Sequence, residues 1–363
     1  MDNQNITEIE SLLCSLPGDS QKIFNQIFQL STTTGRLDPP EQMHQWIEKF
    51  FGSVEAVKEQ KVVKTMNTVT FDGALFNELR AKRPIETKIN SSLFDEIEKN
   101  IGDPLCNPLT GTPADVLGRI TGQASVTASN IAKYDGFHGL VVFNQHNPLN
   151  FTKEMVIDYL DTAWQWALKA HRVDPAAKYY FFMWNCLWKS GGSLLHGHAQ
   201  MTLSRDFHYA RVEQWRRGAI CYGDQFGANY FDDLYQVHRD LGLGFEHKGV
   251  RVMAYLTPIK EKETLLISSG LDANLKEAIF TALDCLYRRL GVTTFNVAIY
   301  LPPMAPASED WRGFPTIVRI VDRGDPMNRT NDIGAMELYA CSVISSDPFA
   351  VARVMRERFA EDS

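Results

Sequence analysis

The sequence predicts an α+β fold in which one unit, an antiparallel sheet with a helix across one face, occurs twice. Three observations support this fold. The chain has 363 residues, of which 44% are hydrophobic, so it can bury a core of two domain-sized units. Each half contains one long amphipathic helical pattern. Each pattern is preceded and followed by two short apolar segments with the composition of strands.

The first unit is expected around a helix over residues 152–171. Its apolar side chains recur at the spacing of one helix face: Val156, Leu160, Ala163, Ala167 and Ala170. Strands are expected on both sides of this helix, at residues 124–129, 139–143, 179–185 and 194–203. The chain order strand, strand, helix, strand, strand predicts an antiparallel sheet that the helix covers.

The second unit is expected around a helix over residues 272–290, which Gly291 ends. The flanking strands are expected at residues 250–255, 264–268, 295–301 and 315–321. Overlaying the two helices places residues 315–319 over residues 196–200, so the second copy lacks the two histidines of the first. We therefore expect one active unit and one silent unit, the alternative being a coincidental likeness of two α+β hairpins.

The first 100 residues do not show the pattern of strands and one long helix that defines the two units. Helices are expected over residues 20–30 and 40–51, followed by an extended stretch over residues 61–71. We therefore expect three parts, which are a mostly helical N-terminal segment with an extended arm (1–100), the histidine-bearing unit (101–215) and the histidine-lacking unit (216–363).

Composition excludes several classes of protein. The net charge of −7 argues against a general nucleic-acid binder, whose affinity depends on a basic surface. The six cysteines include no Cys-x-x-Cys pair, which argues against a disulfide framework and favours a reducing cytoplasm. No segment resembles a signal peptide or a membrane span. We expect a cytoplasmic protein without nucleic-acid or membrane partners.

The strongest functional signal lies in residues 190–200, which read Ser-Gly-Gly-Ser-Leu-Leu-His-Gly-His-Ala-Gln. In an extended strand, His196, His198 and Gln200 share one face behind a glycine-rich turn. The turn offers N–H groups to an anion, a histidine can attack phosphorus, and a neutral amide can donate to a phosphate oxygen. The pattern favours nucleotidyl transfer, and its alternatives are a buried histidine pair or a structural metal site.

This segment resembles the active-site motif of the histidine-triad (HIT-like) superfamily, in the branch of galactose-1-phosphate uridylyltransferase, ADP-glucose phosphorylase and dinucleoside tetraphosphate phosphorylase. That branch ends its motif in glutamine, as Gln200 does here, whereas the hydrolases carry a third histidine. Residues 80–84, 129–134 and 334–338, and Asn185 before the loop, are similar to further segments of the branch. The resemblance implies that both units are HIT-like.

The resemblance also implies a ping-pong reaction through a covalent nucleotidyl-histidine. His198 would attack the α-phosphorus of a sugar nucleotide or dinucleoside polyphosphate, and a phosphate or sugar-phosphate acceptor would resolve the intermediate. Gln200 would bind the transferring phosphoryl group, Ser190 would stabilise developing charge, and His196 would orient the loop or bind a metal. The implied substrate-binding residues are Asn130, Lys133, Asn185, Lys189, Gly191, Gly192, Ser193, Arg80 and Arg83.

A zinc ion is the one cofactor that the resemblance suggests. The implied ligands are Cys106, His146 and His196, with Asp103 where many uridylyltransferases have the first cysteine of a Cys-x-x-Cys pair. In the alternative, His196 orients the loop and no metal binds. His138 is expected to be structural, although it opens a strand that could line the pocket.

Three further points stay open at this stage. A nucleotide hydrolase of the histidine-triad type and a non-catalytic nucleotide sensor are the competing functions. Glu337 stands one residue further from Gly334 than the hexose-contacting glutamate of the family does from its glycine, so galactose specificity is not implied. Some relatives imply a homodimer.

Overall fold

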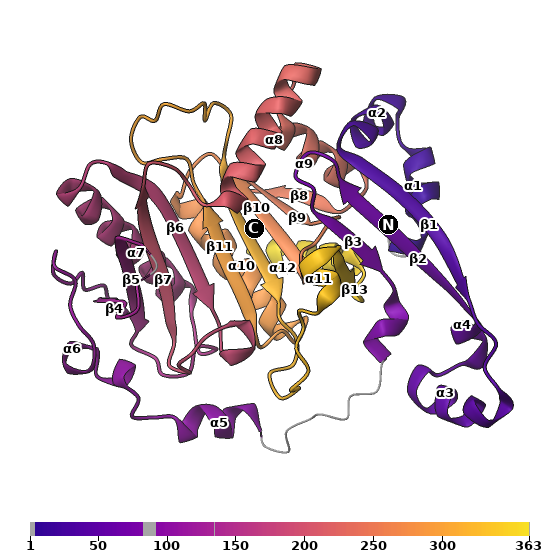
Figure 1. The fold of residues 1–363 in the computed structure, drawn as a ribbon, viewed down its shortest axis with the longest axis horizontal. Coiled ribbons are helices and arrows are strands. Elements are labelled where there is room, and N and C mark those ends of the chain that lie inside the picture. Colours follow the sequence, from indigo (N-terminus) through magenta and orange to yellow (C-terminus); the bar gives the residue numbers. More distant parts are fainter. Residues whose placement is uncertain (1–3, 83–91, 134, 363) are drawn as a thin grey trace.

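The two units lie side by side in one nine-stranded sheet, ordered β4-β5-β7-β6-β11-β12-β10-β9-β8, in the computed structural model (Figure 1). The structure describes residues 4–82, 92–133 and 135–362. The strands of the first unit are β4 (Ser125–Ser129), β5 (Phe137–Phe143), β6 (Ala177–Asn185) and β7 (His198–Arg205). Those of the second unit are β8 (Gly244–His247), β9 (Val250–Ala254), β10 (Glu261–Ser268), β11 (Phe295–Tyr300) and β12 (Thr316–Asp322).

One long helix covers a face of each unit, as the apolar periodicity predicts. Helix α7 (Lys153–Val173) packs on β4 to β7, and helix α10 (Ala273–Arg288) packs on β9, β10 and β12. Each begins at a side-chain cap, because Thr152 accepts from the Met155 N–H and Asp272 accepts from the Leu275 N–H. The last helix, α12 (Pro348–Ala360), packs beside α10. The duplicated α+β fold is therefore confirmed.

A second, four-stranded sheet follows the order β1-β2-β3-β13 and lies at the β8–β10 end of the large sheet (Figure 1). It contains β1 (Phe28–Arg36), β2 (Glu59–Asn67), β3 (Gly73–Phe76) and β13 (Ser342–Ile344). The expected helix through residue 30 is too long, because α2 ends at Ile27 and residues 28–36 form β1. This stretch is rich in β-branched threonine and pairs with β2 along its whole length.

The remaining helices connect and cover these sheets. They are α1 (Ile9–Ser15), α2 (Gly18–Ile27), α3 (His44–Phe51), α4 (Val54–Lys58), α5 (Leu93–Lys99), α6 (Pro108–Gly111), α8 (Ala210–Phe226), α9 (Tyr230–Asp240) and α11 (Ala335–Tyr339). Short 3-10 helices lie at Ile6–Glu8, Glu41–Met43, Glu78–Lys82, Pro104–Cys106 and Trp188–Ser190. The expected boundary between residues 215 and 216 lies within α8. None of the helices in the described ranges combines the length and apolar character of a transmembrane span.

The sheet register relates the two units across the junction of β6 and β11. Met183 of β6 pairs with Gln200 on one side and with Ala298 of β11 on the other, and Ala298 pairs with Arg319 of β12. Paired residues share a face, so these side chains form a row on one face of the sheet. Arg319 therefore occupies in the second unit the position that Gln200 occupies in the first.

The small sheet covers this face in the second unit. Asp72, which lies between β2 and β3, is buried, and its Oδ2 atom is 3.4 Å from Nη2 of Arg319. Nε of Arg319 donates to Oε1 of buried Glu263 at 2.6 Å. Two hydrogen bonds join the small sheet to the same region, from Thr65 to the Leu256 carbonyl and from Asn67 to the Tyr255 hydroxyl. The position that corresponds to Gln200 is thus filled by a buried ion pair.

The loop between β11 and β12 is held to the sheet by a carboxylate. Oε1 of Glu309 accepts from the Tyr179 hydroxyl at 2.6 Å and from Nε1 of Trp311 at 3.0 Å. Burial alone would raise the pKa of Glu309, but these hydrogen bonds lower it to about 2. Because the pKa is lower in the folded state than the ordinary 4.5, this contribution is complete above pH 4.5 and is lost as the pH falls towards 2.

Glu309→Gln is therefore expected to lower the free energy of unfolding at pH 7 by about 1 kcal/mol, since the charge-assisted hydrogen bonds weaken. The variant should also lose less stability than the parent protein between pH 4.5 and 2. Urea unfolding at a series of pH values measures both effects. Identical pH dependence in the two proteins would contradict this account.

Candidate functional site

The connection between β6 and β7 forms a tight loop that its own backbone carbonyls hold together. Ser190 donates its hydroxyl towards the carbonyls of Cys186 and Leu187, at 2.7 and 2.8 Å. The Gly192 N–H donates to the Leu187 carbonyl at 3.0 Å. The Ser190 hydroxyl, expected to stabilise developing charge, thus contacts the loop itself.

Two positions in this loop favour glycine. Gly191 has a φ of +96°, in the left-handed region. A Cβ atom on Gly192 would lie 2.9 Å from the Leu187 carbonyl oxygen and 3.1 Å from that of Asn185. Leu187 itself has φ 67° and ψ 175°, a conformation that side-chain-bearing residues rarely adopt and that costs about 1–3 kcal/mol. The loop is therefore a tight turn with a specific backbone conformation.

His198 is the first residue of β7, and its ring is oriented by the loop. Its Nδ1 atom lies 2.8 Å from the His196 carbonyl oxygen, which can only accept. Nδ1 therefore carries the proton, and Nε2 carries the lone pair. Burial lowers the pKa of His198, against the opposing effect of this hydrogen bond. The lowered pKa favours the neutral ring, in which Nε2 is unprotonated.

Gln200, two residues further along the same strand, belongs to a cluster of polar side chains. Its Oε1 atom lies 2.9 Å from Nε2 of His138 and 3.5 Å from Nδ2 of Asn130. Oδ1 of Asn130 accepts from the Ala132 N–H at 3.0 Å, so the Asn130 amino group faces the cluster. The structure thus brings the predicted Asn130 and Gln200 together.

Two residues next to this cluster make contacts that differ from the roles expected from the sequence. His138, expected to be only structural, is fully buried and contacts Gln200. Lys133, expected to bind substrate, donates to Ser129 Oγ at 2.7 Å and to the His138 carbonyl at 2.9 Å. Its ammonium group therefore holds the turn between β4 and β5.

Apolar side chains line the sheet next to His198. Val142 of β5 pairs with His198 and shares its face. It belongs to a small buried cluster that is separate from the main core and consists of Leu105, Val126, Ala128 and Val142, with Leu140 and Leu194 packed against it. An apolar surface therefore adjoins the histidine on the side of β4 and β5.

Four potential metal ligands meet behind the loop. Asp103, Cys106, His146 and His196 each offer one ligand atom, and these atoms lie within 4.8 Å of one another. The Cys106 sulfur is 3.2 Å from Nδ1 of His146 and 3.4 Å from Nδ1 of His196. His196 precedes β7, so its ring joins this cluster, while His198 and Gln200 lie within the strand.

The cluster fits a tetrahedral zinc ion. Ligands about 2.0–2.3 Å from zinc lie about 3.3–3.6 Å from one another, close to the separations of the sulfur and the two Nδ1 atoms, while Oδ1 of Asp103 lies 4.0 Å from Nδ1 of His196. Nε2 of His146 lies 2.9 Å from the Ile97 carbonyl, and Nε2 of His196 lies 2.7 Å from the Phe143 carbonyl. Both Nε2 atoms therefore donate, which leaves the Nδ1 lone pairs for a metal. Oδ2 of Asp103 is buried and has no hydrogen-bond partner within the described ranges.

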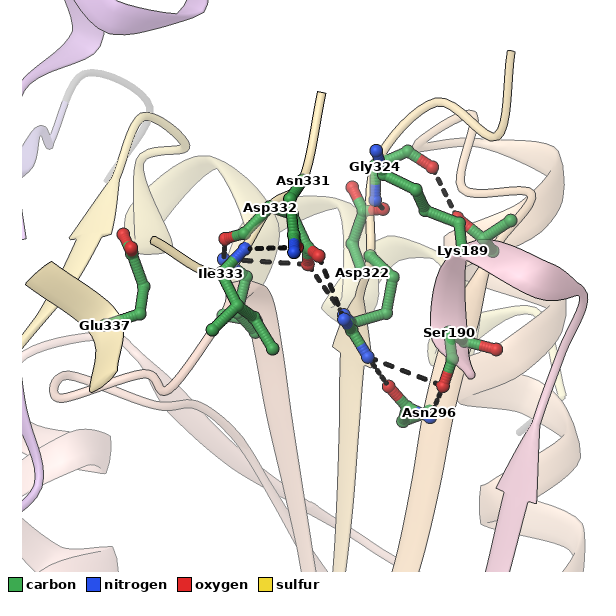
Figure 2. Close-up of polar contacts among 12 residues, drawn as sticks. Lys189, Ser190, Asn296, Asp322, Gly324, Asn331, Asp332, Ile333 and Glu337 are labelled. Carbon is green, nitrogen blue, oxygen red and sulfur yellow. Dashed lines mark hydrogen bonds and ion pairs between the residues drawn. The ribbon is translucent and has the colours of Figure 1, made fainter. Parts of the chain in front are cut away.

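The second unit contacts the loop from the other side (Figure 2). Lys189 donates to the carbonyls of Asn328 and Thr330, so its ammonium group, expected to bind substrate, is engaged with the segment after β12. Asn185 and Ser190 contact Asn296 of β11. The second unit therefore supports the loop of the histidine-bearing unit.

Of the two predicted phosphate-binding arginines, the structure describes Arg80. Arg80 lines a cavity of about 400 Å³ together with Lys260, Arg323, Asp332 and Glu337. Arg83 lies outside the described residues. Glu337 accepts from the Gly334 N–H at 2.8 Å and so caps α11.

No protein-family model and no curated protein matches the sequence. The structure is similar to an ADP-glucose phosphorylase from Arabidopsis thaliana with bound ADP-glucose, with a TM-score of 0.61 and 15% identity over 80% of this chain and 97% of that chain. A GalT-like protein from the same plant gives 0.59, at the same identity and coverage. A uridylyltransferase gives 0.55 and 15% identity, over 69% of this chain and 89% of that one. The chain thus has the duplicated histidine-triad-like fold of these proteins.

Proposed function

We propose that the protein transfers a nucleoside monophosphate from a sugar nucleotide or dinucleoside polyphosphate to a phosphate or sugar-phosphate acceptor, through a covalent intermediate on His198. The observation that carries this proposal is the His198 ring itself. It is neutral, its Nδ1–H is bound to the His196 carbonyl, and it starts the strand directly after a glycine-rich turn. An imidazole held in this way is prepared for attack through Nε2.

The proposed reaction has two balanced steps. In the first, Nε2 of His198 attacks the α-phosphorus while the bond from this phosphorus to the bridging oxygen breaks, and the leaving group departs as a phosphate ester. In the second, an oxygen of the acceptor phosphate attacks the same phosphorus and the P–N bond breaks. The Nδ1–H···O hydrogen bond to the His196 carbonyl stabilises the positive charge that the ring gains in between.

Groups near His198 can bind the transferring phosphoryl group and the nucleoside attached to it. Gln200, on the same strand face as His198, is an uncharged donor and does not repel phosphate oxygens. The N–H groups of Gly191 and Gly192, expected to bind phosphate, donate instead to the Trp188 and Leu187 carbonyls at 3.0 Å each, and so hold the shape of the turn that precedes β7. The apolar cluster around Val142 provides a surface for the nucleoside base. With an anionic phosphate as acceptor, no general base is required, which favours transfer over hydrolysis.

We further propose that Asp103, Cys106, His146 and His196 hold a zinc ion. When bound, this ion would serve as a structural cross-link that is closed by four protein ligands. Ligation fixes the His196 ring, and the carbonyl of the same residue holds Nδ1 of His198. The metal ligands therefore act on the nucleophile through the backbone of His196.

Cys106→Ala is expected to reduce the zinc content from about one ion per chain to a small fraction, because it removes the only thiolate of the set. The melting temperature should fall as well. Elemental analysis and thermal unfolding measure the two effects, and Cys221→Ala, which removes an exposed thiol elsewhere, is the control. Equal zinc content in both variants and the parent would exclude this site.

Intact-protein mass spectrometry after brief incubation with UDP-, ADP- and GDP-sugars and diadenosine tetraphosphate tests the proposed function. The expected result is an acid-labile mass increase of one nucleoside monophosphate, which a phosphate or sugar-phosphate acceptor removes. Release of nucleoside monophosphate without an acceptor would indicate the hydrolase instead. Nucleotide binding without any adduct would indicate a sensor and overturn the proposal.

A further inference from the structure

A chain of polar side chains runs from the silent unit to the catalytic loop (Figure 2). Arg323 follows β12 and donates from Nε and Nη2 to the two carboxylate oxygens of Asp332, at 2.7 and 2.9 Å. Its Nη1 atom donates to Oδ1 of Asn296 at 2.6 Å. Nδ2 of Asn296 then donates to Oδ1 of Asn185, also at 2.6 Å. The chain joins the ends of β12, β11 and β6.

The direction of each hydrogen bond in this chain follows from the guanidinium group. Arginine has donors only, so the atom of Asn296 that faces Arg323 must be its oxygen. The amino group of Asn296 must then face Asn185, which must present its own oxygen. The amino group of Asn185 is therefore the part that remains for another acceptor. One cation thus fixes the orientation of two successive amides, which would otherwise be interchangeable by rotation.

The same two residues also hold the backbone of the loop. The Ser190 carbonyl accepts from Nδ2 of Asn296 at 2.9 Å and from Nη1 of Arg323 at 3.5 Å. This carbonyl therefore points towards the second unit. The N–H of the same peptide belongs to Gly191, points in the opposite direction and donates to the Trp188 carbonyl at 3.0 Å.

Asp332 keeps Arg323 in this position. The side chains of Arg323 and Asp332 are only 13% and 17% exposed. Burial would raise the pKa of Asp332, but the bonds from Arg323 outweigh it and lower the pKa. The pair therefore stays charged at neutral pH, and a bidentate contact of this kind restricts the guanidinium plane.

We propose that Arg323 and Asn296 are positioning residues for the catalytic loop, and that the unit without the histidines contributes them. They turn the amino group of Asn185 towards the phosphate oxygens of the bound nucleotide. This inference rests on the proposed nucleotidyl transfer. It gives the silent unit a specific part in the reaction, although none of its side chains serves as nucleophile.

Asn296→Asp tests the polarity of the chain. An aspartate keeps the contact with Arg323 but offers Asn185 an acceptor, so Asn185 should rotate and present its oxygen to the phosphate. The rate of adduct formation should then fall about 100-fold, which is typical of losing one preorganised donor. Lys262→Met is the control, since it removes a nearby cation that pairs with Asp322 and not with Asn296. A rate equal to that of the control overturns the proposal.

A double-mutant cycle with Asn185→Ala separates positioning from general structural damage. Arg323→Met alone should reduce the rate of adduct formation by at least about 10-fold, and clearly less when Asn185 is already alanine, because the two act on one group. Arg323→Lys keeps the charge without the planar fork and should lie between Arg323→Met and the parent. Equal fold-losses for Arg323→Met in both backgrounds would show that it does not act through Asn185.

Hydrogen exchange of the peptide over residues 186–195 provides a measurement without nucleotide. Arg323→Met should exchange faster than Lys262→Met in this peptide, because the Ser190 carbonyl loses a partner. If the parent protein forms no adduct with any nucleotide, the proposed function fails while the exchange result still tests the loop contact. If the parent forms the adduct, Asn296→Asp and Arg323→Met keep the parent's rate of adduct formation, and Arg323→Met keeps the parent's rate of hydrogen exchange, the positioning role is wrong.

Discussion

His198→Asn is expected to abolish the nucleotidyl adduct and to lower turnover by at least about 10⁴-fold, the scale seen when a covalent nucleophile is removed. Asparagine retains a group that can donate to the His196 carbonyl, so the loop should keep its conformation. It has no nitrogen lone pair that can attack phosphorus. Intact-protein mass spectrometry and steady-state assays measure the two losses.

His44→Asn is the matched control, because its ring lies in the N-terminal segment and contacts only the Pro39 carbonyl among the described residues. It should keep the adduct. Burial lowers the pKa of His198 below its ordinary 6.5, so the neutral ring persists as the pH falls through that value. The rate of adduct formation should therefore decline only below pH 6.5. A nucleotide adduct that survives in His198→Asn would assign the nucleophile elsewhere.

Arg319→Met is expected to lower the free energy of unfolding by about 3–5 kcal/mol, the largest effect on stability among these variants. The substitution leaves the buried carboxylate of Glu263 without its cation, and it leaves buried Asp72 with Arg211 alone, at 3.7 Å. It also removes a guanidinium group that lies 4.8 Å from the Trp215 ring centre. Urea unfolding followed by fluorescence measures the change.

Arg288→Met provides the comparison for this stability effect. Arg288 also pairs with a carboxylate, that of Asp284 at 2.6 Å, but its side chain is 67% exposed. Its loss should therefore lower the free energy of unfolding by less than about 1 kcal/mol. Adding Glu263→Gln and Asp72→Asn to Arg319→Met should recover part of the loss, since the uncompensated charges are removed. A loss no greater than that of Arg288→Met would show that this pair is dispensable.

Much of the fold could be predicted because its elements are defined locally. The helix expected over residues 152–171 appears as α7 (Lys153–Val173), since its apolar face repeats without interruption. The strand expected over residues 179–185 appears within β6 (Ala177–Asn185) for the same reason. Strand β1 was missed because residues 28–30 continue the apolar pattern of α2, and only pairing with β2 decides between helix and strand.

The residues of the candidate site also fall into two groups, those that lie in one continuous segment and those that only strand pairing brings together. The loop and the residues from His196 to Gln200 lie in one continuous segment, so the sequence could identify them together. Asn296 meets Asn185 only through the pairing of β6 with β11, which joins strands far apart in the chain, and Arg323 contacts Asn296 in turn. His138 reaches Gln200 through the register of β5 with β7. Such contacts depend on sheet register, which no local pattern specifies.

Strand β13 has a consequence for how the chain is made. It pairs in parallel with β3, so that Ser342 lies opposite Ala74, and it completes the small sheet. At about 5–20 residues per second, a ribosome needs roughly 15–50 s to proceed from β3 to β13. During that interval β3 has one unpaired edge, which can recruit strands from neighbouring nascent chains. Shielding of this edge by a chaperone, or a low density of nascent chains during synthesis, should therefore increase the yield of native protein.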